Sequence, residues 1–285
     1  MKKKGFLLAI VLLLALALVM TGCAKKEEPK VEQPKEEPKQ EVKQEGDGSW
    51  ERVTKAGKIV AGLDDNYPPM GFRDEKGQLT GFDIDMAKEM SKRLGIEIEW
   101  QPTAWDGVVA SLKAKKFDVI ISGMTVTEER LKEVNFAGPY IFAAQAVCVQ
   151  DKNDTIKTNA DLKGKVVGTQ NGSTGYKVAE ELLNKGELKE IKGYSDYALA
   201  FQDLKIGRVD AVISDNYVIA GYIKNMPGEF KMTGELFAEE TNGIAVRKED
   251  KELYDKLNQV IKDMIQDGTL AKISEEWLGG DATAK

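Results

Sequence analysis

Histidine is missing from this 285-residue chain, and cysteine occurs only 2 times. Without histidine the chain lacks the commonest general base, the commonest metal ligand and the usual charge switch near neutral pH. The spacing of a phosphate-binding loop, GxxxxGK[ST], is absent as well. These absences argue against histidine-based catalysis, and we expect no metal site and no cofactor.

Basic side chains are also outnumbered by acidic ones, so the formal net charge is −6 at pH 7. A chain this acidic is a poor binder of nucleic acid and would not adhere to anionic lipid by charge. A hydrophobic content of 42% is that of a globular protein. The length suffices for one large domain or for two lobes of ordinary size.

The apolar run from Phe6 to Met20 is too short for a comfortable membrane span, and it follows three lysines. It leads into Cys23 through small residues that resemble a bacterial lipobox, with Met20 in place of the usual leucine. We predict a signal peptide at residues 1–22 and a diacyl lipid on Cys23. The alternative is an ordinary secretory signal with a chance cysteine. Cys148 lies in an apolar run and is predicted to be buried.

Residues 23–49 are predicted to form a disordered tether. They are rich in Lys, Glu, Gln and Pro and too poor in apolar side chains to fold. Removal of the signal peptide would delete three lysines and take the net charge from −6 to −9. A lipid would therefore supply the membrane attachment that charge cannot supply. We expect the globular part to begin near Trp50.

One segment of the chain occurs twice. Leu112–Gly123 returns in altered form as Leu204–Asp215, 92 residues later. Each copy has the pattern of a helix end, a tight turn and a buried strand. The repeat therefore predicts two similar α/β lobes. Since ligands of open α/β sheets bind beyond the carboxyl ends of strands, we expect a small molecule between Ser122-Gly123 and Ser214-Asp215.

The remaining pattern alternates strands and helices, which favours mostly parallel sheets flanked by helices. The first lobe is expected to contain strands at 58–63, 96–100 and 117–121, a hairpin at 71–81, a helix from a cap at Asp83 to Gly95, and a helix at 107–114. For the second lobe we expect strands at 165–168 and 209–213 and helices from Tyr176 and over 196–207. A long amphipathic helix should then end at Gly268, and Trp277 should close the ordered part.

Two strand-to-helix turns could bind an anion. Thr125 and Glu128 fit a capping box, and Arg130 adds a planar fork suited to a carboxylate. The turn Gly172–Gly175, with Ser173 and Thr174, is the second. Each has a simpler explanation: a capped helix with Arg130 on the surface, and a plain helix cap at Ser173.

Other candidate ligand contacts follow strand ends. Asp215 could take an ammonium group, Asp64 and Tyr67 follow the first strand, and Trp105 precedes a helix. Taken singly, such aspartates often cap helices, and such aromatic residues often fill cores. Their common placement beyond strand ends makes them candidates for one site.

From about Trp50 to Leu278 the chain resembles the polar amino-acid-binding proteins of bacterial ABC importers. The resemblance rests on several motifs in the right order: Gly62–Pro69, Gly81–Asp85, Trp105–Gly107, Phe117–Gly123, Thr127–Arg130, Asn135-Phe136 and Pro139-Tyr140. It implies the two-lobed periplasmic-binding-protein fold of type II. It also implies lobes of residues 50–140 with 241–285, and of residues 141–240, joined by hinge segments near Phe142 and Glu240.

The same resemblance implies a role for each end of the ligand. Arg130 resembles the arginine that clamps the α-carboxylate, helped by Thr125 and Thr174. Asp215 resembles the acid that receives the α-ammonium, with the backbone at Gly123 nearby. Because the two charges come from different lobes, both ends of a zwitterion would be paired only in a closed cleft.

The side chain of the ligand is assigned less sharply. Tyr67 and Trp105 correspond to its walls, Asp64 to an acid that meets a polar or cationic end, and Gln170 to a position that varies with the ligand. Asp64 and the acidic chain favour arginine or lysine, whereas Gln170 would equally suit glutamine or cystine.

The resulting prediction is a binding protein and not an enzyme. It would be monomeric and lipid-anchored on the outer face of the cytoplasmic membrane, and would deliver a polar amino acid to the permease of an ABC importer. Two other classes stay open: an enzyme like the cyclohexadienyl dehydratases on the same scaffold, and a ligand-sensing receptor domain. An enzyme would need a placed general acid, which must be Asp, Glu or Lys here.

Overall fold

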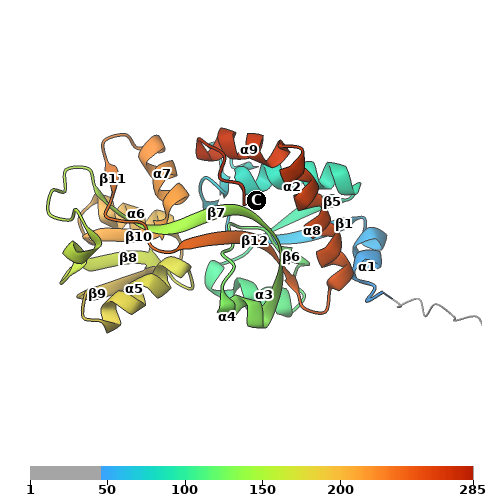
Figure 1. Cartoon of the computed structure of the whole chain (residues 1–285), viewed down its shortest axis with the longest axis horizontal. Helices are drawn as coiled ribbons and strands as arrows, with labels where there is room; N and C mark the ends of the chain where they lie inside the picture. Colours follow the sequence, from blue (N-terminus) through green and yellow to red (C-terminus); the bar gives the residue numbers. More distant parts are fainter. Residues whose placement is uncertain (1–45, 285) are drawn as a thin grey trace, which may run out of the picture. The chain divides into compact units, whose positions relative to one another are not determined.

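A computed structural model describes residues 46–284 of the chain (Figure 1). The predicted signal peptide, Cys23 and most of the predicted tether lie outside these residues. The helices, including two short 3-10 turns, are α1 (Ser49–Ala56), α2 (Phe82–Leu94), η1 (Trp105–Gly107), α3 (Val108–Lys113), α4 (Glu128–Glu133), η2 (Asn159–Leu162), α5 (Thr174–Asn184), α6 (Tyr197–Lys205), α7 (Asn216–Asn225), α8 (Lys251–Gln266) and α9 (Thr269–Leu278). None of those helices combines the length and the apolar character that a bilayer span requires.

The strands form one long sheet and a small hairpin sheet. They are β1 (Lys58–Leu63), β2 (Asn66–Tyr67), β3 (Gly71–Arg73), β4 (Leu79–Thr80), β5 (Glu97–Pro102), β6 (Val119–Ile120), β7 (Val134–Gln150), β8 (Val166–Gln170), β9 (Glu190–Tyr194), β10 (Ala211–Asp215), β11 (Phe230–Thr233) and β12 (Glu239–Arg247). The long sheet runs β5-β1-β6-β12-β7-β10-β8-β9, with β11 also paired to β7, and β2-β3-β4 form the second sheet.

The two halves of the long sheet have the same plan. In lobe 1, β1 lies between parallel β5 and β6, and antiparallel β12 follows β6. In lobe 2, β8 lies between parallel β9 and β10, and antiparallel β7 follows β10. Helices flank both faces of each half (Figure 1). The two-lobed α/β architecture predicted from the repeat is therefore confirmed.

A repeated aspartate ties neighbouring strands together in each lobe. Asp118 accepts a hydrogen bond from the Val60 amide at 2.9 Å, and its own amide donates to Val60 O at 2.8 Å. Asp210 makes the same pair with Val166, at 2.8 Å in both directions. Each carboxylate thus satisfies a backbone donor that the short neighbouring strand leaves unpaired.

Two long antiparallel strands connect the lobes. The β7 strand pairs with β12 in lobe 1 and with β10 and β11 in lobe 2. Between the lobes, Phe142 lies opposite Thr241, and Ala143 lies opposite Glu240. These pairs are continuous backbone crossings, so any change in the angle between the lobes must bend this part of the ladder.

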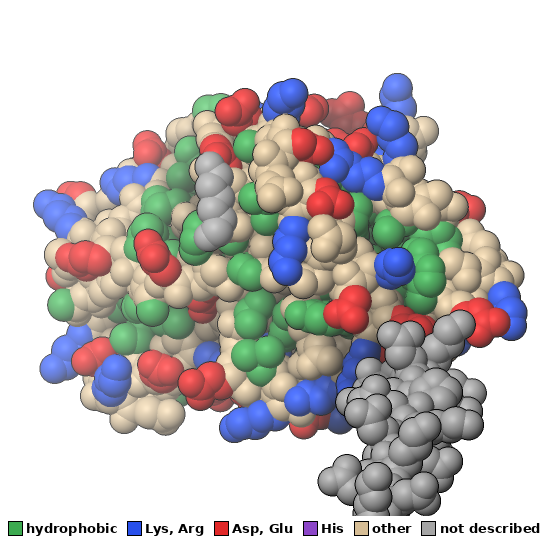
Figure 2. All heavy atoms as spheres, turned by 45° about the vertical axis from the view of Figure 1, so that its right-hand side comes forward, with side chains coloured by type: hydrophobic (Ala, Val, Ile, Leu, Met, Phe, Trp, Pro, Cys, Tyr) green, Lys and Arg blue, Asp and Glu red, His purple; other side chains and the backbone are tan. Residues whose placement is uncertain are grey.

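Helix α8 covers the β7 side of the sheet with a buried apolar stripe of Leu253, Leu257, Val260, Ile261 and Met264. Such a stripe recurs every three to four residues and explains why the amphipathic pattern was readable from the sequence. On the face drawn in Figure 2, acidic and basic side chains are interspersed with hydrophobic ones. Cys148 is fully buried, as predicted.

Several local predictions were wrong. Asp83 does not cap α2, because the helix begins after Gly81 and Asp83 lies within it, where its carboxylate accepts bonds from other elements. The ordered part also continues past Trp277. After the helix stop at Gly279, the chain runs beside β7, where Ala282 O accepts from the Phe142 amide at 2.8 Å.

The repeated aspartates should contribute unequally to stability. Asp118 is partly buried and also forms ion pairs with Arg52 and Arg247, whereas Asp210 is exposed. We expect Asp118→Ala to lower the free energy of unfolding by ~1–3 kcal/mol, and Asp210→Ala by ~0.5–1.5 kcal/mol. Urea titration of both variants measures the difference. An equal or larger loss for Asp210→Ala would contradict this ranking.

Candidate functional site

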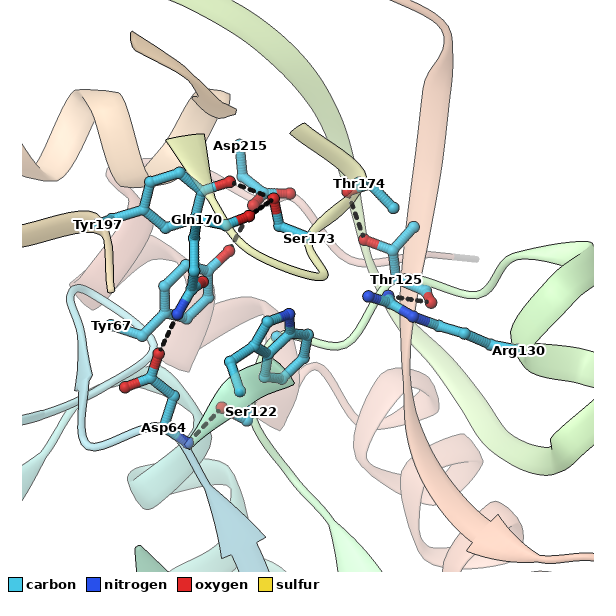
Figure 3. A pocket seen from close by; sticks show the side chains of 12 residues that line it. Asp64, Tyr67, Ser122, Thr125, Arg130, Gln170, Ser173, Thr174, Tyr197 and Asp215 are labelled. Carbon is cyan, nitrogen blue, oxygen red and sulfur yellow. Dashed lines mark hydrogen bonds between the residues drawn. The ribbon is translucent and has the colours of Figure 1, made fainter. Parts of the chain in front are cut away.

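One pocket lies between the lobes, beyond the ends of β1, β6, β8 and β10 (Figure 3). It is lined by Asp64, Tyr67, Trp105, Ser122, Gly123, Thr125, Arg130, Gln170, Ser173, Thr174, Tyr197 and Asp215. The structure therefore brings together all eleven predicted site residues and adds one that was not predicted.

Asp64 forms one acidic corner of the pocket and is buried, with 8% of its surface exposed. It follows β1, and its amide donates to Ser122 Oγ at the end of β6, at 3.0 Å. Its carboxylate accepts from Gln170 Nε2 of lobe 2 at 2.7 Å, and Gln170 also donates to Ser195 O at 3.1 Å. Burial raises the pKa of the Asp64 carboxyl, and the charges of Asp196 and Asp65 add to the shift.

Asp215 forms the opposite acidic corner at the end of β10 and is 4% exposed. It accepts hydrogen bonds from the Tyr67 hydroxyl of lobe 1 and from Gln145 Nε2 of β7, the latter at 2.8 Å. The hydroxyls of Tyr67 and Tyr217 lie 3.2 Å apart, so Asp215 stands at the end of a buried row of hydrogen-bonded hydroxyl groups. Burial raises the pKa of Asp215 to about 6.

Tyr197, the lining residue that we did not predict, stacks on Tyr67 with ring centroids 5.9 Å apart. Its hydroxyl donates to Ser173 Oγ at 3.1 Å. The sequence contained a signal for it, because Tyr197 follows Trp105 by 92 residues, the offset of the repeat. Each lobe thus contributes one aromatic residue from the start of the equivalent helix.

Arg130 lies at the rim of the pocket, on α4. Its guanidinium donates to Thr125 O at 2.9 Å and, across the cleft, to Gly172 O at 3.2 Å. The guanidinium carbon lies over the Trp105 ring, 5.4 Å from the ring centroid. Among the ion pairs of residues 46–284, none involves Arg130. Its side-chain hydrogen bonds go to carbonyl oxygens, and the charges of Asp215 and Glu240 act on it from beyond ion-pair distance.

The predicted capping box at Thr125 is wrong. Thr127 caps α4 by accepting from the Arg130 amide at 3.1 Å, and Thr125 lies in extended backbone bridged to Asn242. Thr125 lies two residues before the helix cap and lines the pocket, where its hydroxyl lies 3.4 Å from that of Thr174 (Figure 3).

The turn Gly172–Gly175, the second candidate for binding an anion, contains the plain helix cap at Ser173 that was its simpler explanation. Ser173 caps α5 by accepting from the Tyr176 amide at 3.0 Å, and α5 begins at Thr174, two residues earlier than predicted. Its N-terminus is nevertheless directed at the pocket, next to the carbonyl of Gly172 that Arg130 contacts. A helix start and a guanidinium therefore adjoin, which favours an anion between them.

Asp83 supports the floor of the pocket without lining it. It is fully buried, and it accepts from the Gly123 amide at 2.8 Å and from the Tyr140 hydroxyl at 3.0 Å. Gly123 has φ +52, and a Cβ there would come within 2.8 Å of the Tyr67 ring. A glycine is required at this position, and Asp83 holds it in place. Burial raises the pKa of Asp83 to about 7.

The lining carries two carboxylates, Asp64 and Asp215, and a single cation, Arg130. The acids lie at separate corners, so the pocket suits a molecule with one carboxylate and up to two positive groups. Across residues 46–284, no three His, Cys, Asp or Glu side chains are grouped as metal ligands would be.

Known proteins are similar to this chain in sequence and in fold. Residues 59–280 match the family described as bacterial extracellular solute-binding proteins, family 3. The L-cystine-binding protein TcyJ of Escherichia coli (strain K12) is 38% identical over 238 residues, covering 83% of this chain and 88% of the relative. A solved structure of an ancestral arginine-binding protein bound to arginine has 46% identity and a TM-score of 0.74, covering 78% of this chain and 99% of that chain.

A second solved structure, the ancestral amino acid-binding protein AncCDT-1, is described as a precursor of cyclohexadienyl dehydratase. It has 40% identity and a TM-score of 0.75, and covers 80% of this chain and 98% of that chain. The family match extends over most of the chain, from β1 to the residues after α9. The chain belongs to the bacterial extracellular solute-binding proteins, family 3.

Proposed function

We propose that this protein binds a free polar L-amino acid outside the cytoplasm and delivers it to an ABC importer, with arginine as the leading ligand. The observation that carries the proposal is the pair formed by Arg130 of lobe 1 and Asp215 of lobe 2. They face the same pocket from opposite lobes, and within residues 46–284 Arg130 forms no ion pair and donates to carbonyl oxygens instead.

The pair matches the two ends of an amino acid. Arg130 and the N-terminus of α5 would hold the α-carboxylate, and Asp215 would receive the α-ammonium. Burying either charge of a zwitterion unpaired would cost several kcal/mol. Both are paired only when the lobes meet, so ligand binding would favour the closed form.

A positively charged side chain would meet Asp64. Its carboxylate is buried and is held by a neutral donor, Gln170, which a guanidinium could replace with a charged one. The relatives support this class without deciding the ligand, because one is named for cystine and another is bound to arginine. Glutamine and cystine are therefore the alternatives.

The lobes would close about the crossing segments. We propose lobes of residues 50–140 with 241–285 and of residues 141–240, with the hinge where Phe142 pairs with Thr241 and Ala143 with Glu240. The closed surface would then be recognised by the permease. We propose that the protein acts as a monomer and as a binding protein, not as a dehydratase.

The central contact can be tested by combining a variant with a modified ligand. Arg130→Ala should weaken arginine binding at least ~30-fold, because truncating one partner of a buried charge pair costs ~2–5 kcal/mol. Asp215→Ala should do likewise. Argininamide, with its carboxylate blocked, should bind weakly to the wild type and lose little more in Arg130→Ala. Titration calorimetry measures all four combinations.

Arg208→Ala is the matched control, because Arg208 is exposed and forms its ion pair within residues 46–284 with Asp203. Additive effects of amidation and Arg130→Ala would show that Arg130 does not bind the carboxylate. Mass spectrometry after incubation with prephenate or arogenate distinguishes the enzyme alternative, since a binding protein leaves both unchanged.

Asp64 should set the preference for a cationic side chain. We expect Asp64→Asn to weaken arginine binding ~10-fold or more and glutamine binding much less, since a charged hydrogen bond contributes ~1.5–3 kcal/mol. Asp65→Asn provides the control, because the neighbouring acid pairs with Arg73 outside the pocket lining. An equal loss for both ligands would mean that Asp64 only shapes the loop.

We propose further that the protein is attached to the outer face of the cytoplasmic membrane through a lipid on Cys23. The proposal rests on the lipobox-like sequence and on the acidic charge. Cys23→Ser should release the protein into the medium or leave an unprocessed precursor, as seen by fractionation and mass measurement. A variant that matures normally and stays in the membrane fraction would refute the anchor.

A further inference from the structure

Three hydrogen-bond donors converge on one oxygen of Glu240, a residue predicted from the sequence only as part of the hinge. Its Oε2 accepts from Gln145 Nε2 at 3.0 Å, from the Thr174 hydroxyl at 3.2 Å and from the Thr125 hydroxyl at 3.4 Å. Thr125 belongs to lobe 1, Thr174 to lobe 2 and Gln145 to the crossing strand β7. Glu240 lies on the other crossing strand, β12.

The protons available to this cluster are few. Gln145 Nε2 has two hydrogens but three acceptors, since it lies 2.8 Å from Asp215 Oδ1, 3.0 Å from Glu240 Oε2 and 2.9 Å from Thr174 Oγ1. Charged acceptors make the stronger bonds, so the two carboxylates take the two amide hydrogens. The Thr174 oxygen then receives neither amide hydrogen and stays available as an acceptor for another donor.

The same count applies to the hydroxyl protons. Each threonine hydroxyl has one hydrogen and two lone pairs. When Thr125 and Thr174 donate to Glu240, neither can also donate to a bound carboxylate. Both threonine hydroxyls line the pocket, and each can offer only a lone pair toward it. A donor-rich group such as an ammonium fits that arrangement, and a carboxylate does not.

We infer that Glu240 is a positioning residue: it takes the hydroxyl protons of Thr125 and Thr174, so that their oxygens join Asp215 in receiving the ligand's α-ammonium. This inference rests on the proposed function. It moves the two threonine hydroxyls from the carboxylate end, where the family resemblance had placed them, to the ammonium end. The carboxylate is left to Arg130 and the first backbone amides of α5.

The local charge agrees with this assignment. Glu240 and Asp215 share the amide of Gln145, and the charge of Glu240 contributes to the raised pKa of Asp215. Arg130 is a cation whose charge acts on both acids, but its guanidinium donates to carbonyl oxygens, so neither carboxylate has a cation of residues 46–284 in direct contact. An ammonium next to Asp215 would supply one.

The experiment compares Glu240→Gln with Glu239→Gln. Glu239 is the exposed neighbour on the same strand, so both variants remove one negative charge and keep the side-chain length. Arginine and 5-guanidinopentanoate, which lacks only the α-amino group, are titrated by calorimetry into each variant and the wild type. We expect Glu240→Gln to weaken arginine at least ~10-fold, and Glu239→Gln to change it less than about twofold. For 5-guanidinopentanoate, Glu240→Gln should change affinity less than about twofold, because the ligand has no ammonium to place.

Two results would overturn the inference: equal behaviour of the two glutamine variants, or an equal loss for both ligands in Glu240→Gln. If Glu240→Gln does not fold, Thr174→Val serves instead, because it removes one of the two hydroxyl acceptors. This variant should also weaken the binding of arginine and leave the binding of 5-guanidinopentanoate unchanged. Equal losses of affinity for the two ligands would overturn the inference. Failure of the wild type to bind any of the twenty amino acids or cystine would refute the proposed function, and this inference with it. Binding by the wild type with no effect of Glu240→Gln would refute this inference alone.

Discussion

The closed cleft depends on each lobe supplying the donor for the other lobe's buried acid. Asp64 of lobe 1 accepts from Gln170 of lobe 2, and Asp215 of lobe 2 accepts from Tyr67 of lobe 1. A carboxylate that loses water must find hydrogen bonds elsewhere, at a cost of several kcal/mol if it does not. Opening the lobes exchanges these bonds for water. Closing them returns the acids to a site where a bound cation would be strongly attracted.

The repeat explains why the site has two similar sides, and the differences between its copies explain why it is not symmetric. Asp118 and Asp210 tie equivalent strands, and Trp105 and Tyr197 begin equivalent helices. At the strand end the copies differ, because Gly123 in one lobe corresponds to Asp215 in the other. At this position one lobe therefore offers only backbone groups to a ligand, and the other lobe offers a negative charge. Such a pocket can orient a molecule whose two ends differ.

The crossing strands do more than connect the lobes. Gln145 on β7 and Glu240 on β12 lie in the segments that a change of lobe angle must bend, and both contact the polar groups of the pocket. A ligand that reorganises these hydrogen bonds would act directly on the proposed hinge. Site chemistry and lobe angle would then be linked by two side chains rather than by a long path through the core.

Much of the fold and of the candidate site could be read from the sequence alone. Strand and helix periodicity, the repeat of 92 residues and the strand-end rule placed β1, β5, β6, β8 and β10, but not β9 or the crossing strands β7 and β12. The family resemblance added which residues would meet, and all eleven candidate residues line one pocket. These features depend on contacts within a short stretch of chain, or on a stretch that occurs twice in the sequence.

What only the tertiary structure decided is which donor each polar group finds. Asp83 and Thr125 have the sequence pattern of helix caps, yet Asp83 holds Gly123 and Thr125 faces Glu240. Local capping propensity cannot foresee such partners, because Thr125 and Glu240 lie 115 residues apart and meet only when β12 passes beside the pocket. A buried polar group is satisfied by whatever the fold brings near it, and the fold, not the neighbouring sequence, decides that.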